Sequence, residues 1–330
     1  MIENVKIGVV GCGALGSFYG AKLCRDGREV HFLLRSDYEV VRREGVRIRS
    51  VEGDFQVNPK CARTPEEIGV CDLILIGLKS TANDQFAALL TPLVGPATTL
   101  MTLQNGLGNE RQLASLFGVG RILGGLCFVC LNRVEPGVVQ HLAHGAIVMG
   151  EYAGLPGART QDIASIFQHA GISCRVTEDL ERAHWEKLIW NIPFNGLGVA
   201  SAAGHEALAG SPSSLRRLRP TGACLPTDRL LADAQWETLV RELMLEVIAA
   251  ANALGFRVPE SAAETQISRT RTMGTYKAST LIDFERGMPL ELESMFLEPL
   301  REAKRAGIAT PRLAALCGVL KRLNPGARRQ

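Results

Sequence analysis

The first half of the chain alternates short apolar runs with helix-like stretches. That order predicts a parallel sheet whose strands are joined by crossover helices. A hairpin is expected at 45–57, with its turn around Gly53. The predicted strands are 5–10, 29–34, 72–78 and 98–103, with two or three more within 122–149, and the predicted helices are 14–24 and 81–90.

The second half is helical in character, since strand-like alternation ends at about Asp179. Apolar residues recur every three or four positions through 236–254 and predict one long amphipathic helix, which Gly255 ends. We therefore expect two domains, 1–178 and 179–330. The predicted fold class is α/β, with an N-terminal doubly wound domain followed by a mostly α-helical domain.

Composition narrows the class of protein. The 37 basic and 34 acidic residues give a net charge of only +3, which argues against nucleic acid or a membrane surface as the main partner. No apolar run is long enough to span a bilayer. Nine scattered cysteines fit a reducing compartment better than a disulfide framework. With no leader-like segment before the first predicted strand, we expect a cytoplasmic protein.

A segment rich in proline, glycine and arginine, 210–228, interrupts the helical half. We expect it to be a solvent-exposed loop. Its arginines, Arg216, Arg217 and Arg219, offer phosphate binding as an alternative.

One cluster superficially resembles a zinc site, with Cys127 and Cys130 followed by His141 and His144. The two cysteines lie on a predicted strand, where residues three apart point to opposite faces. We therefore expect no metal site here.

A glycine-rich turn follows the first predicted strand and opens the first predicted helix. In that context a G-x-G-x-x-G pattern predicts a dinucleotide-binding, Rossmann-type domain. The first glycine allows the tight turn, the second lets the backbone approach the pyrophosphate, and the third lets the helix pack on the strand. The candidate cofactor-binding residues here are Gly11, Cys12, Gly13, Ala14, Leu15 and Gly16.

The end of the second predicted strand distinguishes the two nicotinamide cofactors. Enzymes that bind NAD usually place an acid about 20 residues after the glycine motif, to hold the ribose 2′-hydroxyl. Here the strand ends in Arg35, whose guanidinium matches the 2′-phosphate of NADP. Asp37, two residues later, keeps NAD as an alternative cofactor. Arg35 could also be an ordinary surface arginine with no role in cofactor binding.

Two further polar residues, Lys79 and Asn105, each follow a predicted strand. Ligands bind at that edge of an open parallel sheet, so both are candidates for cofactor binding and Asn105 for substrate binding as well. Lys79 could equally be a solubilising residue. Asn105 precedes Gly106, so a role in a turn competes.

A polar stripe in the second half, formed by Lys187, Asn191 and Asn195, recurs every four residues and so shares one helix face. Reduction of a ketone by hydride transfer builds negative charge on the carbonyl oxygen, and a lysine can supply a proton there. The alternative is the polar face of an ordinary amphipathic helix.

With these features the chain resembles the ketopantoate reductase (2-dehydropantoate 2-reductase) family over nearly its whole length. The segments that carry the resemblance, besides the polar stripe, are Ile7–Gly16, Gly77–Ser80, Leu103–Glu110, Ser279–Asp283 and Leu290–Glu293.

The resemblance implies NADPH-dependent reduction of ketopantoate, a 2-oxo acid, to pantoate, as in pantothenate biosynthesis. It implies that Lys187 is catalytic and polarises the keto oxygen, and that Glu291 acts beside it. It implies that Asn191, Asn195 and Ser279 bind substrate. From the residues alone, Ser279 could instead cap a helix, and Glu291 could be a solvated acid at a helix start.

Two departures from the family pattern affect the expected specificity. The chain has Leu290–Glu293, followed by Phe296 and Leu297, where the family usually reads Thr-Glu-Ile-Asp and then Asn-Gly. The segment 210–228 is also longer than is typical. A reductase of another branched 2-oxo acid therefore stays open.

Two further alternatives do not depend on these departures. One is an NAD-dependent dehydrogenase of 3-hydroxy acids or opine-like compounds, against which Arg35 argues. The other is a non-catalytic NADP-binding sensor, against which Lys187, Asn191, Ser279 and Glu291 argue. The helical half offers a surface for a homodimer.

Overall fold

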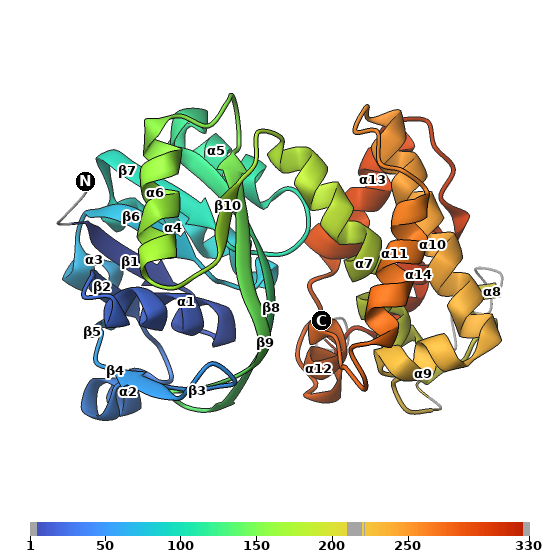
Figure 1. The fold of residues 1–330 in the computed structure, drawn as a ribbon, viewed down its shortest axis with the longest axis horizontal. Helices are drawn as coiled ribbons and strands as arrows, with labels where there is room; N and C mark the ends of the chain where they lie inside the picture. The colour runs from blue at the N-terminus through green and yellow to red at the C-terminus, as the bar shows by residue number, and fades with distance from the viewer. Residues whose placement is uncertain (1–4, 210–219, 221, 326–330) are drawn as a thin grey trace. The chain divides into compact units, whose positions relative to one another are not determined.

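The computed structural model describes residues 5–209, 220 and 222–325. The chain divides into two compact units, Met1–Ala183 and His184–Gln330, which we call the sheet unit and the helical unit (Figure 1). The predicted boundary, between residues 178 and 179, precedes this division by a few residues. Arg216, Arg217 and Arg219 lie outside the described residues, so their phosphate-binding role stays a prediction.

The sheet unit is built on one ten-stranded mixed sheet with the order β4-β3-β9-β8-β7-β6-β1-β2-β5, and β10 pairs with β9. From β5 across to β8 every neighbouring pair is parallel, and the predicted doubly wound architecture is confirmed. The strands are β1 Lys6–Val10, β2 Glu29–Leu33, β3 Val46–Ser50, β4 Phe55–Val57, β5 Lys60–Ala62, β6 Cys71–Ile76, β7 Val94–Thr102, β8 Ile122–Glu135, β9 Val138–Glu151 and β10 Cys174–Val176.

The expected hairpin is confirmed, because β3 and β4 pair antiparallel on either side of Gly53. That glycine has φ 109°, a left-handed conformation that costs glycine little. The expected two or three strands within 122–149 are two long ones, β8 and β9, which form an antiparallel pair.

The predicted helix 81–90 differs from the structure. A 3₁₀ turn, Ser80–Gln85, comes first, and the α-helix α4 covers only Phe86–Leu90. Four of the first five residues of this segment are Ser, Thr, Asn or Asp, whose side chains compete with helical backbone hydrogen bonds. The regular helix therefore starts only where the apolar residues begin.

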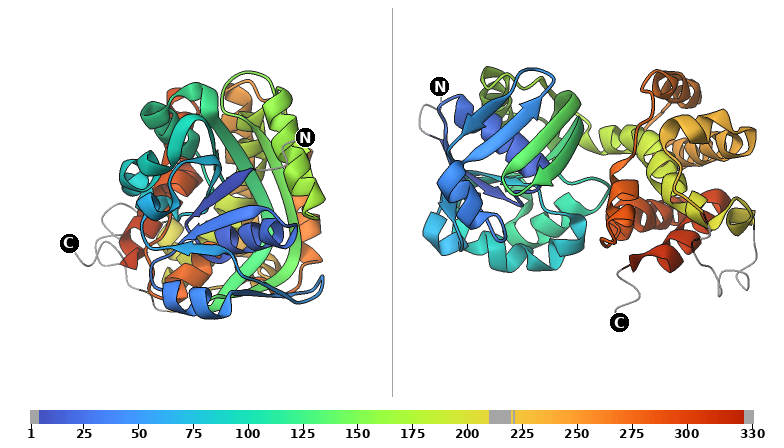
Figure 2. Two further views of the ribbon diagram at one scale, coloured as in Figure 1. Left: turned by 90° about the vertical axis from the view of Figure 1, so that its left-hand side faces the viewer. Right: turned by 90° about the horizontal axis from the view of Figure 1, so that it is seen from below.

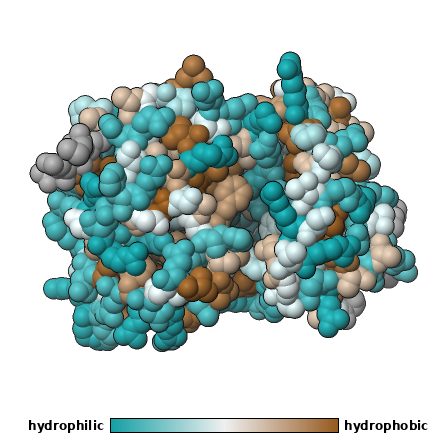
Figure 3. All heavy atoms as spheres, in the orientation of Figure 1, coloured by the Kyte–Doolittle hydropathy of each residue, from teal (hydrophilic) through white to brown (hydrophobic). Residues whose placement is uncertain are grey.

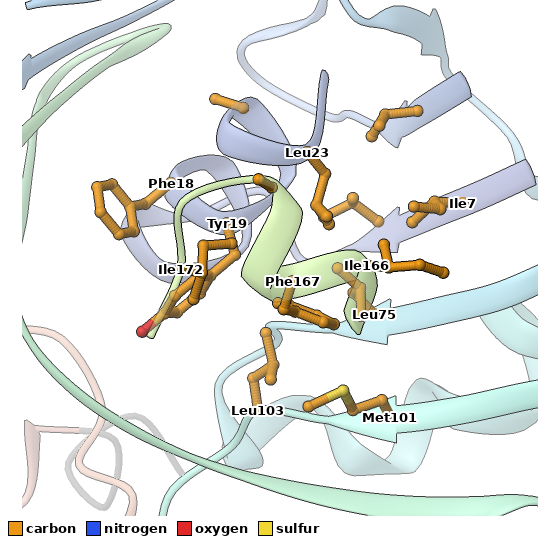
Figure 4. Close-up of a cluster of buried hydrophobic side chains, with 14 of the residues drawn as sticks. Ile7, Phe18, Tyr19, Leu23, Leu75, Met101, Leu103, Ile166, Phe167 and Ile172 are labelled. Atoms are coloured by element: carbon orange, nitrogen blue, oxygen red, sulfur yellow. The ribbon is translucent and has the colours of Figure 1, made fainter. Parts of the chain in front are cut away.

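Helices cover both faces of the sheet (Figure 1 and Figure 2). Residues of α1 and α6 belong to one buried cluster, and residues of α3, α4 and α5 belong to the other. Figure 4 shows the first cluster, where Phe167 packs among side chains of α1 and the central strands. The helices are α1 Ala14–Arg25, α2 Tyr38–Glu44, α3 Pro65–Ile68, α4, α5 Asn109–Phe117 and α6 Ala158–His169.

The helical unit contains the predicted long helix, confirmed as α10, Ala234–Ala253. Asp233 caps it, because Oδ1 accepts the amides of Gln235 at 2.9 Å and Trp236 at 3.2 Å. The predicted loop 210–228 ends sooner than expected, since α9 begins at Thr227. The other helices are α7 Leu180–Ala200, α8 Glu206–Ala209, α9 Thr227–Ala232, α11 Ser261–Arg271, α12 Ser279–Glu285, α13 Glu298–Arg305 and α14 Pro311–Leu323.

The last helix is capped by a side chain from another helix. Both carboxylate oxygens of Glu246, on α10, accept backbone amides at the start of α14, from Arg312 and Leu313, each at 2.9 Å. Burial raises the pKa of this carboxyl, while the two amides act in the opposite direction. The cap fixes where α14 begins against α10.

Among the described residues, no helix has the length and apolar character needed to cross a membrane. The face seen in Figure 3 carries hydrophilic side chains over most of its area, with small hydrophobic patches between them.

The first core cluster gives a test of packing. We expect Phe167→Ala to lower the free energy of unfolding by about 3 to 5 kcal/mol, because the ring is fully buried and a cavity replaces it. Leu155→Ala, at an exposed position of the same unit, should change it by less than about 0.5 kcal/mol. Urea titrations followed by circular dichroism measure both, and equal midpoints would contradict this account of the core.

Candidate functional site

The turn after β1 uses its three glycines in three different ways. Gly11 has φ 96°, and a Cβ there would lie less than 3.0 Å from the backbone of Leu78. A Cβ on Gly16 would lie less than 3.0 Å from the carbonyl oxygen of Gly11. Gly13, in contrast, is exposed, and a Cβ there would meet no atom within 4 Å. The fold therefore requires the first and third glycines, whereas the second borders open space.

The N-terminus of α1 fits the phosphates of a dinucleotide. Gly13 is the N-cap of this 12-residue helix, no side chain caps it, and the first turn holds no acidic residue. The amides of this turn and the helix dipole therefore favour an anion. Burial raises the pKa of the Cys12 thiol well above its usual value, so this side chain adds no negative charge beside the site. Cys12, Ala14 and Leu15 pack against the core below the turn.

This turn lies at the point where the sheet changes its winding direction. β1 pairs with β2 on one side and with β6 on the other, so its carboxyl end is the switch point at which α/β sheets bind ligands. Gly77 follows β6, and a Cβ there would be 2.9 Å from the oxygen of Gly11 and 3.0 Å from the backbone of Gly16. No role was assigned to Gly77 from the sequence. A glycine directly after a predicted buried strand was the feature that could have indicated this close backbone contact.

Arg35 is exposed just past the end of β2, as expected for a residue that meets a cofactor there. Asp37, which left NAD open, is buried and bound elsewhere. Nε of Arg133 donates to its Oδ2 at 2.9 Å, Nη2 of the same arginine donates to Oδ1, and the amide of Gly137 donates to Oδ2 at 3.1 Å. This carboxylate is therefore held by β8 and the turn that follows it.

Lys79 and Asn105 occupy the places predicted for them, after the carboxyl ends of β6 and β7. Lys79 is exposed, and its carbonyl accepts the amide of Ala82 at 2.9 Å. Asn105 is half-buried, and the residue after it, Gly106, has φ 88°. Asn105 therefore does lie in a turn, as the alternative interpretation expected. Its position at the ligand-binding edge of the sheet still allows it to bind a ligand.

The polar stripe of the helical unit lies on α7 and runs from a half-buried lysine into the core. Lys187 is half-buried, Asn191 is 8% exposed and Asn195 is 2% exposed. The alternative of a solvated face on an amphipathic helix is therefore wrong for the two asparagines. Buried amides require hydrogen-bond partners, which a bound polar molecule can provide as well as the protein.

The structure brings Asn195 and Ser279 together. Oδ1 of Asn195 accepts the backbone amide of Thr280 at 3.0 Å and the hydroxyl of Ser279 at 3.3 Å. Ser279 does not cap α12 itself, because the N-cap is Ala278 and the capping oxygen comes from α7. The donor end of the Asn195 amide is not used in this cap. The capping alternative for Ser279 is thus wrong.

Glu291 stands directly before a helical segment, but it is only 7% exposed. The alternative of a solvated acid at a helix start is therefore wrong about solvation, although Glu291 does stand at a helix start. The segment that follows, Glu293–Leu297, has π-helical hydrogen bonding, a local widening that is frequent at functional sites. Phe296, one of the departures from the family pattern, is fully buried there, and a Cβ on Gly196 would lie 3.0 Å from its ring.

The cysteines of the zinc-like pattern divide as the strand geometry predicts. Cys127 belongs to the core cluster beneath α1, with Val129 and Leu131 packed against it, and Cys130 lies outside that cluster. Across the described residues, no group of three or more His, Cys, Asp or Glu side chains is arranged to hold a metal ion.

Two sequence profiles of one protein family match this chain. Sequence profiles described as "Ketopantoate reductase PanE/ApbA" and "Ketopantoate reductase PanE/ApbA C terminal" match residues 7–154 and 218–324. The chain belongs to the ketopantoate reductase family.

Several ketopantoate reductases align over nearly the full chain. A 2-dehydropantoate 2-reductase of Nostoc is 39% identical over 97% of this chain and 95% of its own length. The crystal structure of 2-dehydropantoate 2-reductase from Geobacter metallireducens is 45% identical, with a TM-score of 0.87 over 96% of this chain and 99% of its own. D-mandelate dehydrogenase with NADH and anilino(oxo)acetate, 17% identical with a TM-score of 0.82, shares the fold.

The second glycine of the turn gives a matched test of cofactor binding. Gly13 and Gly157 are both helix N-caps with extended backbone, and a Cβ at either meets no atom within 4 Å. We expect Gly13→Ala and Gly157→Ala each to change the free energy of unfolding by less than about 1 kcal/mol. Only Gly13→Ala should weaken binding of the nicotinamide cofactor, by at least about tenfold, because its methyl group would obstruct the close approach of a pyrophosphate to the backbone. Fluorescence titration measures this, and equal affinities would place the pyrophosphate elsewhere.

Proposed function

We propose that this protein reduces 2-dehydropantoate (ketopantoate) to pantoate with NADPH. The observation that carries the proposal is the hydrogen bond between the buried Asn195, a member of the α7 stripe, and the half-buried Ser279, in a member of the ketopantoate reductase family. A half-buried lysine on the same helix, Lys187, supplies the acid that such a reduction requires.

The sheet unit is proposed to hold the cofactor. The amides at the start of α1 bind the pyrophosphate over Gly13, and Arg35 binds the 2′-phosphate. Two observations support the proposal of NADPH over NADH. Arg35 is exposed, and Asp37 is buried with its carboxylate bound by Arg133. When bound, the nicotinamide supplies the hydride.

The helical unit is proposed to bind the substrate and manage its proton. The ammonium of Lys187 donates a hydrogen bond to the keto oxygen, stabilises the negative charge that develops there, and gives up the proton that completes the hydroxyl group. Asn191, Asn195 and Ser279 bind the hydroxyl and carboxylate groups of the substrate. Glu291, a buried carboxylate, orients the substrate and supports the lysine.

A reductase of another branched 2-oxo acid is the second candidate. The observation in its favour is Phe296, a bulky ring in the π-helical segment that follows Glu291. A panel of 2-oxo acids distinguishes the two candidates by kcat/KM. The cytoplasmic location and the homodimer expected from the sequence stay predictions.

The role of Lys187 is tested by substitution. Lys187→Ala should lower kcat for ketopantoate by about 100- to 10,000-fold, because the acid is lost while the cofactor site is intact. The Kd for NADPH, from fluorescence titration, should stay unchanged. Lys304→Ala, an exposed lysine on α13, is the control and should retain full turnover. Full activity of Lys187→Ala would remove the lysine from the mechanism, and tight NADPH binding by the wild type without turnover of any 2-oxo acid would favour the sensor.

Cofactor choice is tested at Arg35. Arg35→Ala should raise the Kd for NADPH by about 10- to 100-fold, the loss expected for hydrogen bonds to a charged phosphate, and should leave the weaker binding of NADH unchanged. Arg175→Ala, an exposed arginine of β10, should change neither value. An equal loss for both cofactors would show that Arg35 does not contact the 2′-phosphate.

A further inference from the structure

A continuous chain of side-chain hydrogen bonds joins the loop after β6 to the loop after β7. The hydroxyl of Thr102 donates to Oε1 of Gln104 at 2.9 Å, and Nε2 of Gln104 donates to Oδ1 of Asn83 at 2.7 Å. Nδ2 of Asn83 donates to Oδ1 of Asn109 at 2.9 Å. Nδ2 of Asn109 then donates to the backbone carbonyl of Asn105 at 3.1 Å.

The chain is buried over most of its length and has a single direction. Thr102, Gln104 and Asn109 are buried, and Asn83 is half-buried. Each of the three amides accepts with its oxygen and donates with its nitrogen, so turning over any one of them would set like groups against each other. In a site of low dielectric such a network is costly to leave partly satisfied, and it specifies one arrangement of the backbone.

This chain of hydrogen bonds ties together the two loops that carry Lys79 and Asn105. Asn83 lies in the 3₁₀ turn that starts directly after Lys79. Asn109 is the first residue of α5, and the loop before it contains Gly106 with φ 88° and Gly108 with φ 89°. A loop with two glycines has unusual conformational freedom, which the bond from Asn109 to the carbonyl of Asn105 restricts.

We propose that Asn83 and Asn109 are positioning residues for the reaction. They hold the loop of Asn105 in one conformation and tie it to the loop of Lys79, so that both side chains meet the cofactor and the substrate in a preset arrangement. The inference rests on the proposed roles of Lys79 and Asn105. It adds that their placement depends on the amide network of Gln104, Asn83 and Asn109.

The direction of the network gives a sharp test. Asn83→Asp keeps the size of the side chain and its acceptor but removes the donor to Asn109. We expect kcat/KM for ketopantoate to fall about 10- to 100-fold, with a lower kcat and a weaker affinity for NADPH, as for a reacting group displaced by about 1 Å. Gln85→Glu makes the same amide-to-carboxylate change at an exposed position of the same 3₁₀ turn and should keep wild-type values.

A double-mutant cycle separates positioning from general stability. In an Asn105→Ala background, Asn83→Asp should cause a smaller further loss of kcat/KM than in the wild type, because one of the two side chains that it places is already absent. Hydrogen–deuterium exchange should also rise in 80–85 and 103–109 of Asn83→Asp and stay unchanged elsewhere in the sheet unit. Additive losses, or wild-type kinetics and exchange in Asn83→Asp, would overturn the proposal.

Failure of the proposed function would look different. If the wild type reduced no 2-oxo acid, the proposed function would be wrong. Hydrogen–deuterium exchange in 103–109 and the Kd for NADPH would still test whether the network positions the loop. If the wild type were active and Asn83→Asp matched it in both measurements, only the positioning role would fall.

Discussion

The sheet unit depends on how closely two stretches of backbone approach each other at the centre of the sheet. The turn after β1 and the loop after β6 meet through Gly11, Gly16 and Gly77, where an added Cβ would lie within about 3 Å of backbone atoms. This contact sets the distance from α1 to the sheet and leaves the amides at the start of α1 uncapped. A steric constraint on the fold thus accompanies a helix start whose amides no side chain caps, the kind of place at which the phosphates of a dinucleotide bind.

In the helical unit, polar side chains of one helix determine where other helices begin. Asn195, on α7, caps α12, and Glu246, on α10, caps α14. Capping from another helix joins local structure to tertiary packing, because the capped helix starts only where the second helix supplies the acceptor. One residue expected to bind substrate therefore also defines the element that carries Ser279.

Periodicity and local motifs predicted much of this molecule from the sequence. The alternation of apolar runs and helices predicted the parallel sheet with its crossover helices, and the glycines between a strand and a helix predicted the turn after β1. Local motifs could not predict that Asp37 binds Arg133, because the two residues are 96 positions apart in the sequence. The burial of Glu291 and the cap between Asn195 and α12 likewise come from tertiary packing, which has no local signature in the chain.

The cap that Asn195 forms, together with its proposed role in substrate binding, has a consequence for how substrate preference can change over evolution. A replacement at this position that altered recognition of the substrate would also remove the acceptor at the start of α12 unless the new side chain kept an oxygen in the same place. Substitutions at the two asparagines of α7 therefore have different structural costs. Asn191, the other asparagine of α7 proposed to bind substrate, takes no part in that cap, so a replacement there keeps the acceptor at the start of α12.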